Sequence, residues 1–228
     1  MKRNKIFVGA VMILVMIGPR VFSQDVFRIG GSGDYLRPKG VSSSKVQEIY
    51  ADTAWMQSSI TLEKSEKAES ALARYELRSN QIEIRTSRGI SVLDARIVKS
   101  YSTVDKMGRA HEFINGKEFT VGGVPLKGLI EVLSTGKVPL YKKHGFYIKA
   151  PDYNVSLSVG NPNEQVFPQN ELYYAVDKTL VKVPSKKKKL LEVFGDKSTQ
   201  VSSYVDQNKL SVSKENGVTL LFNYYNSL

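Results

Sequence analysis

The chain has 228 residues, of which 41% are hydrophobic and 24% are charged, and this composition excludes a disordered, collagen-like or purely coiled-coil protein. Lysine and arginine outnumber aspartate and glutamate by 33 to 22, so the formal net charge is +11. The chain has no cysteine, which excludes disulfides, thiolate metal sites, a cysteine nucleophile and a lipidated N-terminal cysteine.

The first 23 residues have the pattern of a secretory signal. A basic start, Met1–Lys5, precedes a mostly apolar run, Ile6–Ile17, and Gly18-Pro19 then ends the helix. An uncleaved anchor is the poorer interpretation, because that run rises only about 18 Å against a hydrocarbon core of about 30 Å. We expect cleavage between Ser23 and Gln24, which leaves 205 residues with a net charge of +7 and no later apolar run long enough to span a membrane.

Export sets the expected location and partners. We expect a protein of the periplasm, of the outer membrane surface or of the medium, with an envelope protein, a lipid or a glycan as partner and no nucleic acid. Residues 24–45 are rich in glycine, with a proline and a run of three serines, and predict a flexible lead-in. The folded body is expected over residues 46–184.

This body is predicted to be a β-rich domain. The alternating runs Ala73–Leu77 and Gln81–Arg85 flank Arg78–Asn80, which is typical of a hairpin. Asn115-Gly116 favours another hairpin with a type I′ turn, because both residues tolerate positive φ. Further strands are predicted at Ile90–Leu93, Arg96–Val104, Leu129–Leu133, Val138–Lys142, Phe146–Lys149, Val155–Val159, Leu172–Val176 and Thr179–Val183. About ten short strands indicate a largely antiparallel meander, a sandwich or a half-open barrel.

Residues 185–228 change to a helical period and predict a C-terminal region of about three helices. Ser185 is expected to cap the first helix, which Gly195 ends, and Asp196 and Ser213 are expected to cap the second and third. The fold class is therefore α+β, with a β-rich body and a small helical tail. In Tyr173-Tyr174, adjacent strand positions point to opposite faces, so one tyrosine should be core and the other exposed or against the tail.

The lysine run Lys186, Lys187, Lys188 and Lys189 is a candidate contact for an anionic surface, such as lipid headgroups or polyanionic glycans. The alternative is a solvated face that keeps the protein soluble.

The sequence indicates no catalytic, metal or cofactor site, and we expect a protein that is not an enzyme. His111 and His144 are the only histidines, 33 residues apart and without clustered acids, and satisfied or exposed structural histidines are the better interpretation. The serines lie in no Gly-x-Ser-x-Gly motif, and the glycines of residues 30–33 are not followed by the Lys-Ser/Thr of a phosphate loop.

Several segments resemble a group of uncharacterised exported proteins common in Bacteroidota. The similarity extends over most of residues 46–228 and is carried by Ala51–Ser59, the Arg74–Leu77 and Gln81–Ile84 hairpin, Val124-Pro125-Leu126, Tyr173-Tyr174, Lys187–Leu191, Phe194–Lys197, Asn208–Leu210 and Tyr224–Ser227. The resemblance implies export and architecture, and it implies no activity or site.

Three functional hypotheses follow. The first is a non-enzymatic envelope protein that binds a protein partner or an apolar ligand, which a cavity of a few hundred Å³ would favour. The second is a structural or accessory component of a surface assembly, which an open sheet edge or a large exposed apolar patch would favour. The third is a hydrolase, which would need His111 or His144 beside a carboxylate and a serine in one cleft.

Overall fold

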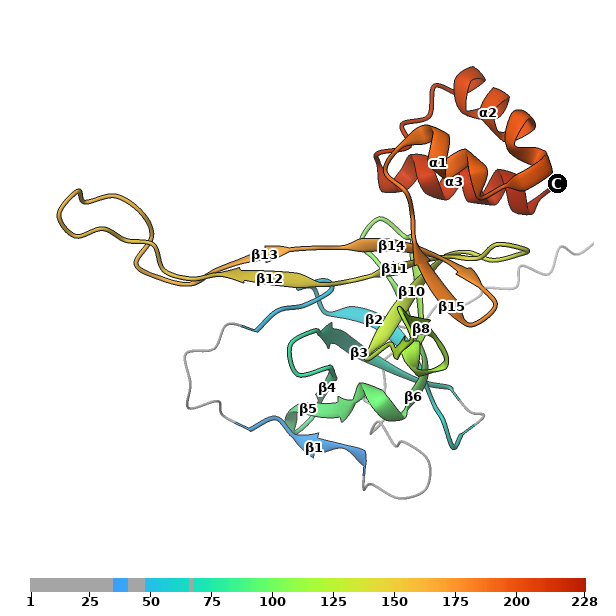
Figure 1. Ribbon diagram of the computed structural model, residues 1–228. Helices are drawn as coiled ribbons and strands as arrows, with labels where there is room; N and C mark the ends of the chain where they lie inside the picture. The colour runs from blue at the N-terminus through green and yellow to red at the C-terminus, as the bar shows by residue number, and fades with distance from the viewer. Residues whose placement is uncertain (1–34, 41–47, 66–67) are drawn as a thin grey trace, which may run out of the picture.

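The computed structural model describes residues 35–40, 48–65 and 68–228, and it confirms the predicted fold class: a large, mostly antiparallel sheet followed by three helices (Figure 1). The predicted export signal, residues 1–23, lies outside the described residues. The strands are β1 Arg37–Pro38, β2 Met56–Leu62, β3 Ala68–Glu76, β4 Gln81–Thr86, β5 Gly89–Asp94, β6 Val98–Val104, β7 Ala110–Asn115, β8 Thr120–Val121, β9 Val124–Pro125, β10 Leu129–Ser134, β11 Leu140–Lys143, β12 Phe146–Lys149, β13 Gln165–Pro168, β14 Glu171–Val176 and β15 Thr179–Lys182. The helices are α1 Lys187–Glu192, α2 Ser198–Gln207 and α3 Glu215–Asn226, with 3-10 turns η2 Ala95–Ile97, η3 Gly116–Glu118 and η4 Gly195–Lys197.

Thirteen strands of the described chain form one sheet in the order β1-β5-β4-β3-β2-β6-β7-β10-β11-β14-β15-β8-β9. Neighbouring strands are antiparallel except β15 and β8, which pair in parallel. The order is linear, so the sheet is not closed into a barrel. The meander was predictable because most neighbours in the sheet are also neighbours in the sequence, and short turns join them.

The hairpin turn predicted at Arg78–Asn80 is confirmed: Glu76 pairs with Gln81, and Asn80 has a φ of +56°. Asp177-Lys178 likewise forms the turn between the predicted strands at Leu172–Val176 and Thr179–Val183, and Asp177 has a φ of +54°. Aspartate and asparagine tolerate this left-handed conformation better than other residues with a Cβ.

The hairpin predicted at Asn115-Gly116 is wrong. Asn115 ends β7, has a φ of −67° and caps η3 by accepting a hydrogen bond from the Lys117 amide. Its amide nitrogen also donates to the Val98 carbonyl at 2.8 Å, and this bond holds it against the start of β6. Glycine is required at position 116 because there is no room for a side chain: a Cβ would lie 2.9 Å from the Gly128 carbonyl oxygen.

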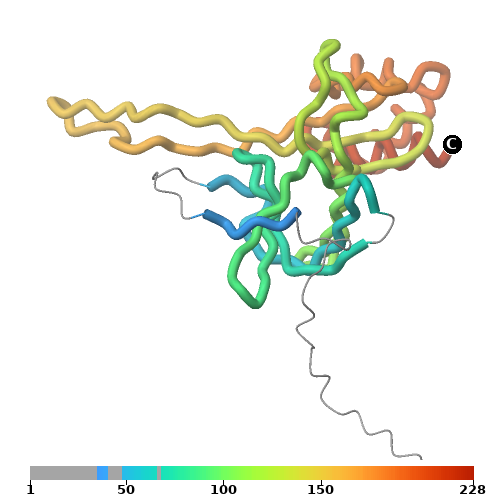
Figure 2. The backbone as a smooth tube through the Cα atoms, turned by 90° about the horizontal axis from the view of Figure 1, so that it is seen from below, coloured from blue at the N-terminus to red at the C-terminus, as the bar shows by residue number. Residues whose placement is uncertain are grey.

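The strand predicted at Val155–Val159 is also wrong, because these residues form the turn at the end of a long ribbon. β12 and β13 pair only with each other and make a second sheet of two strands. We call residues 146–168 the arm. Both backbone views show it extending away from the rest of the molecule (Figures 1 and 2).

The three predicted helices are confirmed, but their predicted caps are not. Lysines occupy the positions before all three, Lys186, Lys197 and Lys214, and none makes a side-chain cap. The helices are stabilised by tertiary packing instead: their apolar faces form a core with Leu140 of β11.

The prediction for the adjacent tyrosines is confirmed. Tyr173 is buried with Tyr141 on one side of the sheet, while Tyr174 packs against the helical core on the other. Within the described residues, no helix is long and apolar enough to cross a membrane.

Part of the predicted lead-in is described, and there the chain pairs with the sheet. Arg37 and Pro38 form β1 against the edge of β5. Tyr35 and Leu36 pack against the main core of the body, whose largest members include Ile82, Leu93 and Tyr101.

The body and the helical tail have separate apolar cores, and the central strands of the sheet contribute residues to both.

Asn226 of α3 joins the helical tail to the turn between β10 and β11. Its side-chain oxygen accepts from the Val138 amide at 3.0 Å, and its nitrogen donates to the Val138 carbonyl and the Ser134 hydroxyl, both at 3.0 Å. We predict that Asn226→Ala lowers the free energy of unfolding by about 1–3 kcal/mol, because partners with little access to water lose their bonds. Urea denaturation measures this, and Asn223→Ala, on the exposed face of the same helix, should change stability by less than about 0.5 kcal/mol. Equal losses in both variants would contradict the assignment.

Candidate ligand-binding pocket

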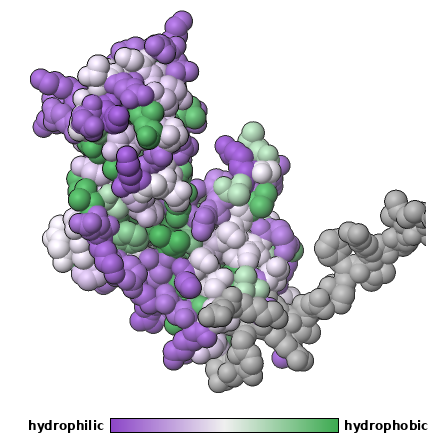
Figure 3. Space-filling view, turned by 90° about the vertical axis from the view of Figure 1, so that its right-hand side faces the viewer, coloured by the Kyte–Doolittle hydropathy of each residue, from purple (hydrophilic) through white to green (hydrophobic). Residues whose placement is uncertain are grey.

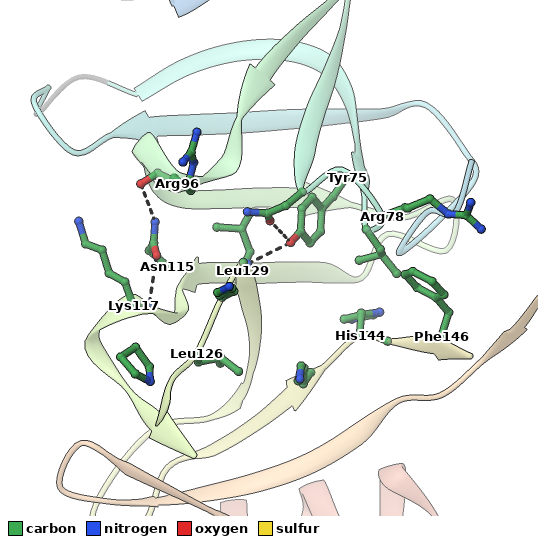
Figure 4. Close-up of a pocket in the computed structure, with 16 residues that line it drawn as sticks. Tyr75, Arg78, Arg96, Asn115, Lys117, Leu126, Leu129, His144 and Phe146 are labelled. Atoms are coloured by element: carbon green, nitrogen blue, oxygen red, sulfur yellow. Dashed lines mark hydrogen bonds between the residues drawn. The ribbon is translucent and has the colours of Figure 1, made fainter. Parts of the chain in front are cut away.

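A pocket of about 770 Å³ lies where the β3–β4 turn, η3, the segment before β10 and the end of β11 meet (Figure 4). Its apolar lining comes from Tyr75, Leu77, Pro125, Leu126, Leu129 and Phe146. Its basic lining comes from Arg78, Arg96, Lys117, Lys127, Lys143 and His144, and no aspartate or glutamate lines it. This size and this mixture of apolar surface with a few polar groups are typical of small-molecule sites.

Tyr75 holds one wall of the pocket in place. Its hydroxyl accepts a hydrogen bond from the Leu129 amide at 3.1 Å and donates to the Asn80 side chain at 2.6 Å. Burial raises the pKa of Tyr75 to about 12, so the hydroxyl keeps its proton for the second bond. Gly128 has a φ of +87°, and a Cβ there would lie 2.7 Å from this hydroxyl. The close approach of the two segments therefore depends on a glycine.

Asn115 holds the opposite wall. Besides its bond to Val98, its amide nitrogen donates to the Ala95 and Arg96 carbonyls, both at 3.2 Å. Figure 4 shows Asn115 between Arg96 and Lys117 at one end of the pocket, with Arg78 and Phe146 at the other. The walls are thus held by hydrogen bonds of the Tyr75 and Asn115 side chains, most of them to backbone groups, and the protein supplies these bonds without a ligand.

Arg78 is the unusual residue of the lining. Its Nε and Nη2 atoms are buried and have no hydrogen-bond partner in the described part of the chain. The guanidinium carbon lies 5.9 Å from the centre of the Phe146 ring. A buried donor without a partner costs about 1–3 kcal/mol, and more when it is charged. Buried groups of this kind call for a partner that the protein itself does not supply.

Beside the pocket, the two histidines meet on one buried carboxylate. Glu131 of β10 is only 3% exposed, and its oxygens bond His111 Nδ1 at 2.6 Å and His144 Nε2 at 2.5 Å. Lys142 lies 3.7 Å from Glu131 and 3.0 Å from Glu215 of α3, so the cluster reaches the helical tail. Asp105 adds a longer contact of 3.4 Å to His111 Nε2.

The electrostatics of this cluster favour an ionised carboxylate. Burial alone would raise the pKa of Glu131, but the hydrogen bonds from His144 and His111 outweigh it and lower the pKa to about 2. For His111, partial burial acts against the charged form, and the bond to Glu131 overcomes it and raises the pKa above 6.5. Each partner therefore stabilises the charged form of the other.

The cluster offers neither a metal site nor a hydrolytic pair. Within the described residues, no group of three or more His, Asp or Glu side chains is arranged to hold a metal ion. The hydrogen bonds described for both imidazoles go to carboxylates, whereas a serine hydrolase needs a base bonded to its nucleophile. Both histidines have hydrogen-bond partners, as expected of structural histidines, but the partner they share, Glu131, was not predicted from the sequence. The signal was Glu131 itself, a lone acid inside the apolar strand Leu129–Leu133.

The lysine run lies far along the chain from the pocket, at the start of α1. Lys186, Lys188 and Lys189 are exposed, and Lys187 pairs with Asp206 of α2 at 2.6 Å. Figure 3 shows mainly hydrophilic side chains over the helical end at the top of the molecule. The structure leaves the run available to solvent or to an anionic surface.

Comparison with known proteins gives no relative: no family model, no curated protein and no solved structure matches the chain.

The Glu131 cluster predicts a specific dependence of stability on pH. We expect Glu131→Gln to lower the free energy of unfolding at pH 7 by about 1.5–3 kcal/mol, because charge-assisted bonds are lost. The folded pKa of about 2 lies below the ordinary 4.5, so the carboxylate's contribution is complete above pH 4.5 and is lost as the pH falls toward 2. The difference between wild type and variant should shrink over that range. Because the pKa of His111 is raised, part of the difference should also vanish as the pH rises above 6.5.

Urea denaturation at a series of pH values measures this profile. Glu112→Gln removes an exposed carboxylate from β7 and should give a small difference at every pH. A Glu131→Gln difference that stays constant from pH 7 to pH 2.5 would contradict the proposed ionisation.

Proposed function

We propose that this chain is an exported, non-enzymatic protein of the cell envelope that binds an apolar or amphipathic small molecule in the pocket beside β10. The export part of the proposal is supported by the signal-like residues 1–23. The binding part is supported by one observation above all, the cavity of about 770 Å³ with an apolar floor. Cavities of about 300–1,000 Å³ are the size that holds most small ligands.

The construction of the pocket supports binding with little rearrangement. The Tyr75 hydroxyl and the Asn115 side chain are bonded to groups in the walls, and Asn80 accepts one of these hydrogen bonds. Two apolar residues of the lining, which form its floor, are buried members of the two cores of the body: Leu129 of the main core and Leu126 of the smaller one. A preformed apolar floor lowers the entropy cost of binding, because few side chains must be ordered by the ligand.

A second candidate function is that of an accessory component in a surface assembly, and the arm favours it. Six large apolar side chains on the arm are exposed: Tyr147, Ile148, Tyr153, Val155, Leu157 and Val159. Within the arm, the stacked rings of Tyr147 and Phe167, 5.1 Å apart, bridge the two strands. A two-stranded ribbon is only marginally stable in water, and its free edges can pair with another chain. Contact with a protein partner would cover this surface.

The pocket predicts binding of a neutral apolar probe. We expect N-phenyl-1-naphthylamine to bind with increased fluorescence, and Leu77→Asp to weaken that binding at least about tenfold by placing a charge in the apolar lining. Leu72→Asp makes the same change at an exposed leucine of β3, outside the pocket, and should leave affinity unchanged.

Circular dichroism of both variants checks their folding. Where Leu77→Asp does not fold, Phe146→Ala serves in its place, with Phe167→Ala on the arm as its control. A wild-type protein that fails to bind the probe, or equal affinities in the pocket and control variants, would count against the pocket.

The assembly candidate predicts a complex larger than one copy of the mature chain. We expect gentle extraction of the envelope to release the chain in such a complex, and Val155→Asp with Leu157→Asp to release it as a monomer, because charge at the arm's end opposes apolar contact. Sedimentation velocity of the affinity-tagged chain measures this. Val176→Asp, at an exposed valine of β14, should leave the complex intact. A monomeric wild type would refute this candidate.

A further inference from the structure

The pocket's lining carries an excess of positive charge that the protein neutralises only in part. Arg96 pairs with Asp94 at 2.5 Å, and Lys117 pairs with Glu63 at 3.0 Å. The other three lysine and arginine side chains of the lining form no salt bridge within the described residues; they are Arg78, Lys127 and Lys143. Like charges gathered around a hollow raise the local concentration of anions.

The acid nearest to Arg78 in the sequence is already fully used. Glu76 is buried, and its Oε1 accepts from the amides of Ile49 and Arg78, both at 3.1 Å. Its Oε2 accepts from the Ser79 amide at 2.6 Å and from the Ser79 hydroxyl. Four donors thus occupy the carboxylate, which explains why the guanidinium of Arg78 has not folded back onto it.

The two donors that Arg78 leaves without a partner belong to the same edge of its guanidinium. The Nε–H and Nη2–H bonds point in parallel and form a fork that matches the two oxygens of a carboxylate or a phosphate. The fork lies next to apolar lining from Leu77 and Phe146. An anion is held more strongly beside apolar surface than in open water, because the local dielectric constant is lower.

We propose that the pocket's ligand is an amphipathic anion, with a carboxylate or phosphate head on the fork of Arg78 and an apolar body along Leu77, Leu126 and Leu129. This inference rests on the pocket function proposed above and names its ligand class. Lys127 and Lys143 add positive charge to the same hollow without competing acids in the lining. Binding requires the side chain of Arg78 to open slightly, since both donors are buried in the empty pocket.

Three ligands with the same ten-carbon chain test the proposal by isothermal titration calorimetry, with the two anions below their micelle concentrations and decanol below its solubility limit. We expect decanoate, decyl phosphate or both to bind the wild type at least about tenfold more tightly than decanol, the gain of one charge-assisted bond. Comparison of the two anions distinguishes a carboxylate head from a phosphate head.

Variants of Arg78 assign the effect to its fork. Arg78→Gln should weaken binding of the preferred anion by roughly tenfold to a hundredfold and leave decanol unchanged. Arg78→Lys keeps the charge without the fork and should recover only part of the affinity. Arg88→Gln removes an exposed arginine from the β4–β5 turn and should leave all three affinities unchanged.

The outcomes separate this inference from the function on which it rests. Equal affinity of the wild type for decanol and both anions, or an anion affinity that survives both Arg78→Gln and Arg78→Lys, would overturn the anion site while the pocket function stands. Failure of all three ligands to bind the folded wild type would overturn both. Arg78→Lys also keeps the test decisive if Arg78→Gln does not fold.

Discussion

The buried carboxylate of Glu131 is the group around which the centre of the structure is organised. An ionised acid that is 3% exposed must be surrounded by donors, and these come from His111 of β7, Lys142 of β11 and His144, which directly follows β11. Leu129 and Leu133, two residues away on either side, share its face of β10, and one packs with the core of the body and the other with the helical core. The ion cluster therefore lies between the two cores and connects them, because Lys142 also pairs with Glu215 of the tail.

The same cluster fixes where the pocket and the arm begin. His144 bonds Glu131 and also lines the pocket, and Phe146, two residues later, closes the pocket and starts the arm. Between them, Gly145 allows the strands to approach, since a Cβ there would lie 2.7 Å from the Gln169 carbonyl oxygen. A ligand at this end of the pocket would touch the base of the arm. The geometry thus places the two surfaces proposed for binding at one junction of the chain.

Local pattern was enough to predict the meander and the tail, because their turns and apolar periods are short-range features. Arg78–Asn80 and Asp177-Lys178 connect adjacent strands, and packing does not override their turn chemistry. The prediction failed where contacts distant in the sequence decide the local structure. Asn115 bonds the Val98 carbonyl and does not form the predicted hairpin turn. Val155–Val159 has no neighbouring strand in the described chain that would extend it, and it forms the turn of the arm. The pocket was not predictable, because its lining comes from residues 75 to 146, and the free donors of Arg78 appear only once Glu76 is seen to be occupied.

The chain offers two places for an anion, and physical chemistry ranks them. Lys186, Lys188 and Lys189 are solvated, so salt screens their attraction within about 8–10 Å, and the water they would lose on binding opposes them. The fork of Arg78 has already lost its water without gaining a partner, so an anion there meets a smaller desolvation cost. The acid nearest in the sequence, Glu76, is already bonded to backbone amides and to Ser79, and no aspartate or glutamate lines the pocket. The two donors of Arg78 are therefore the better match for the proposed anion, and the lysine run adds at most a general attraction.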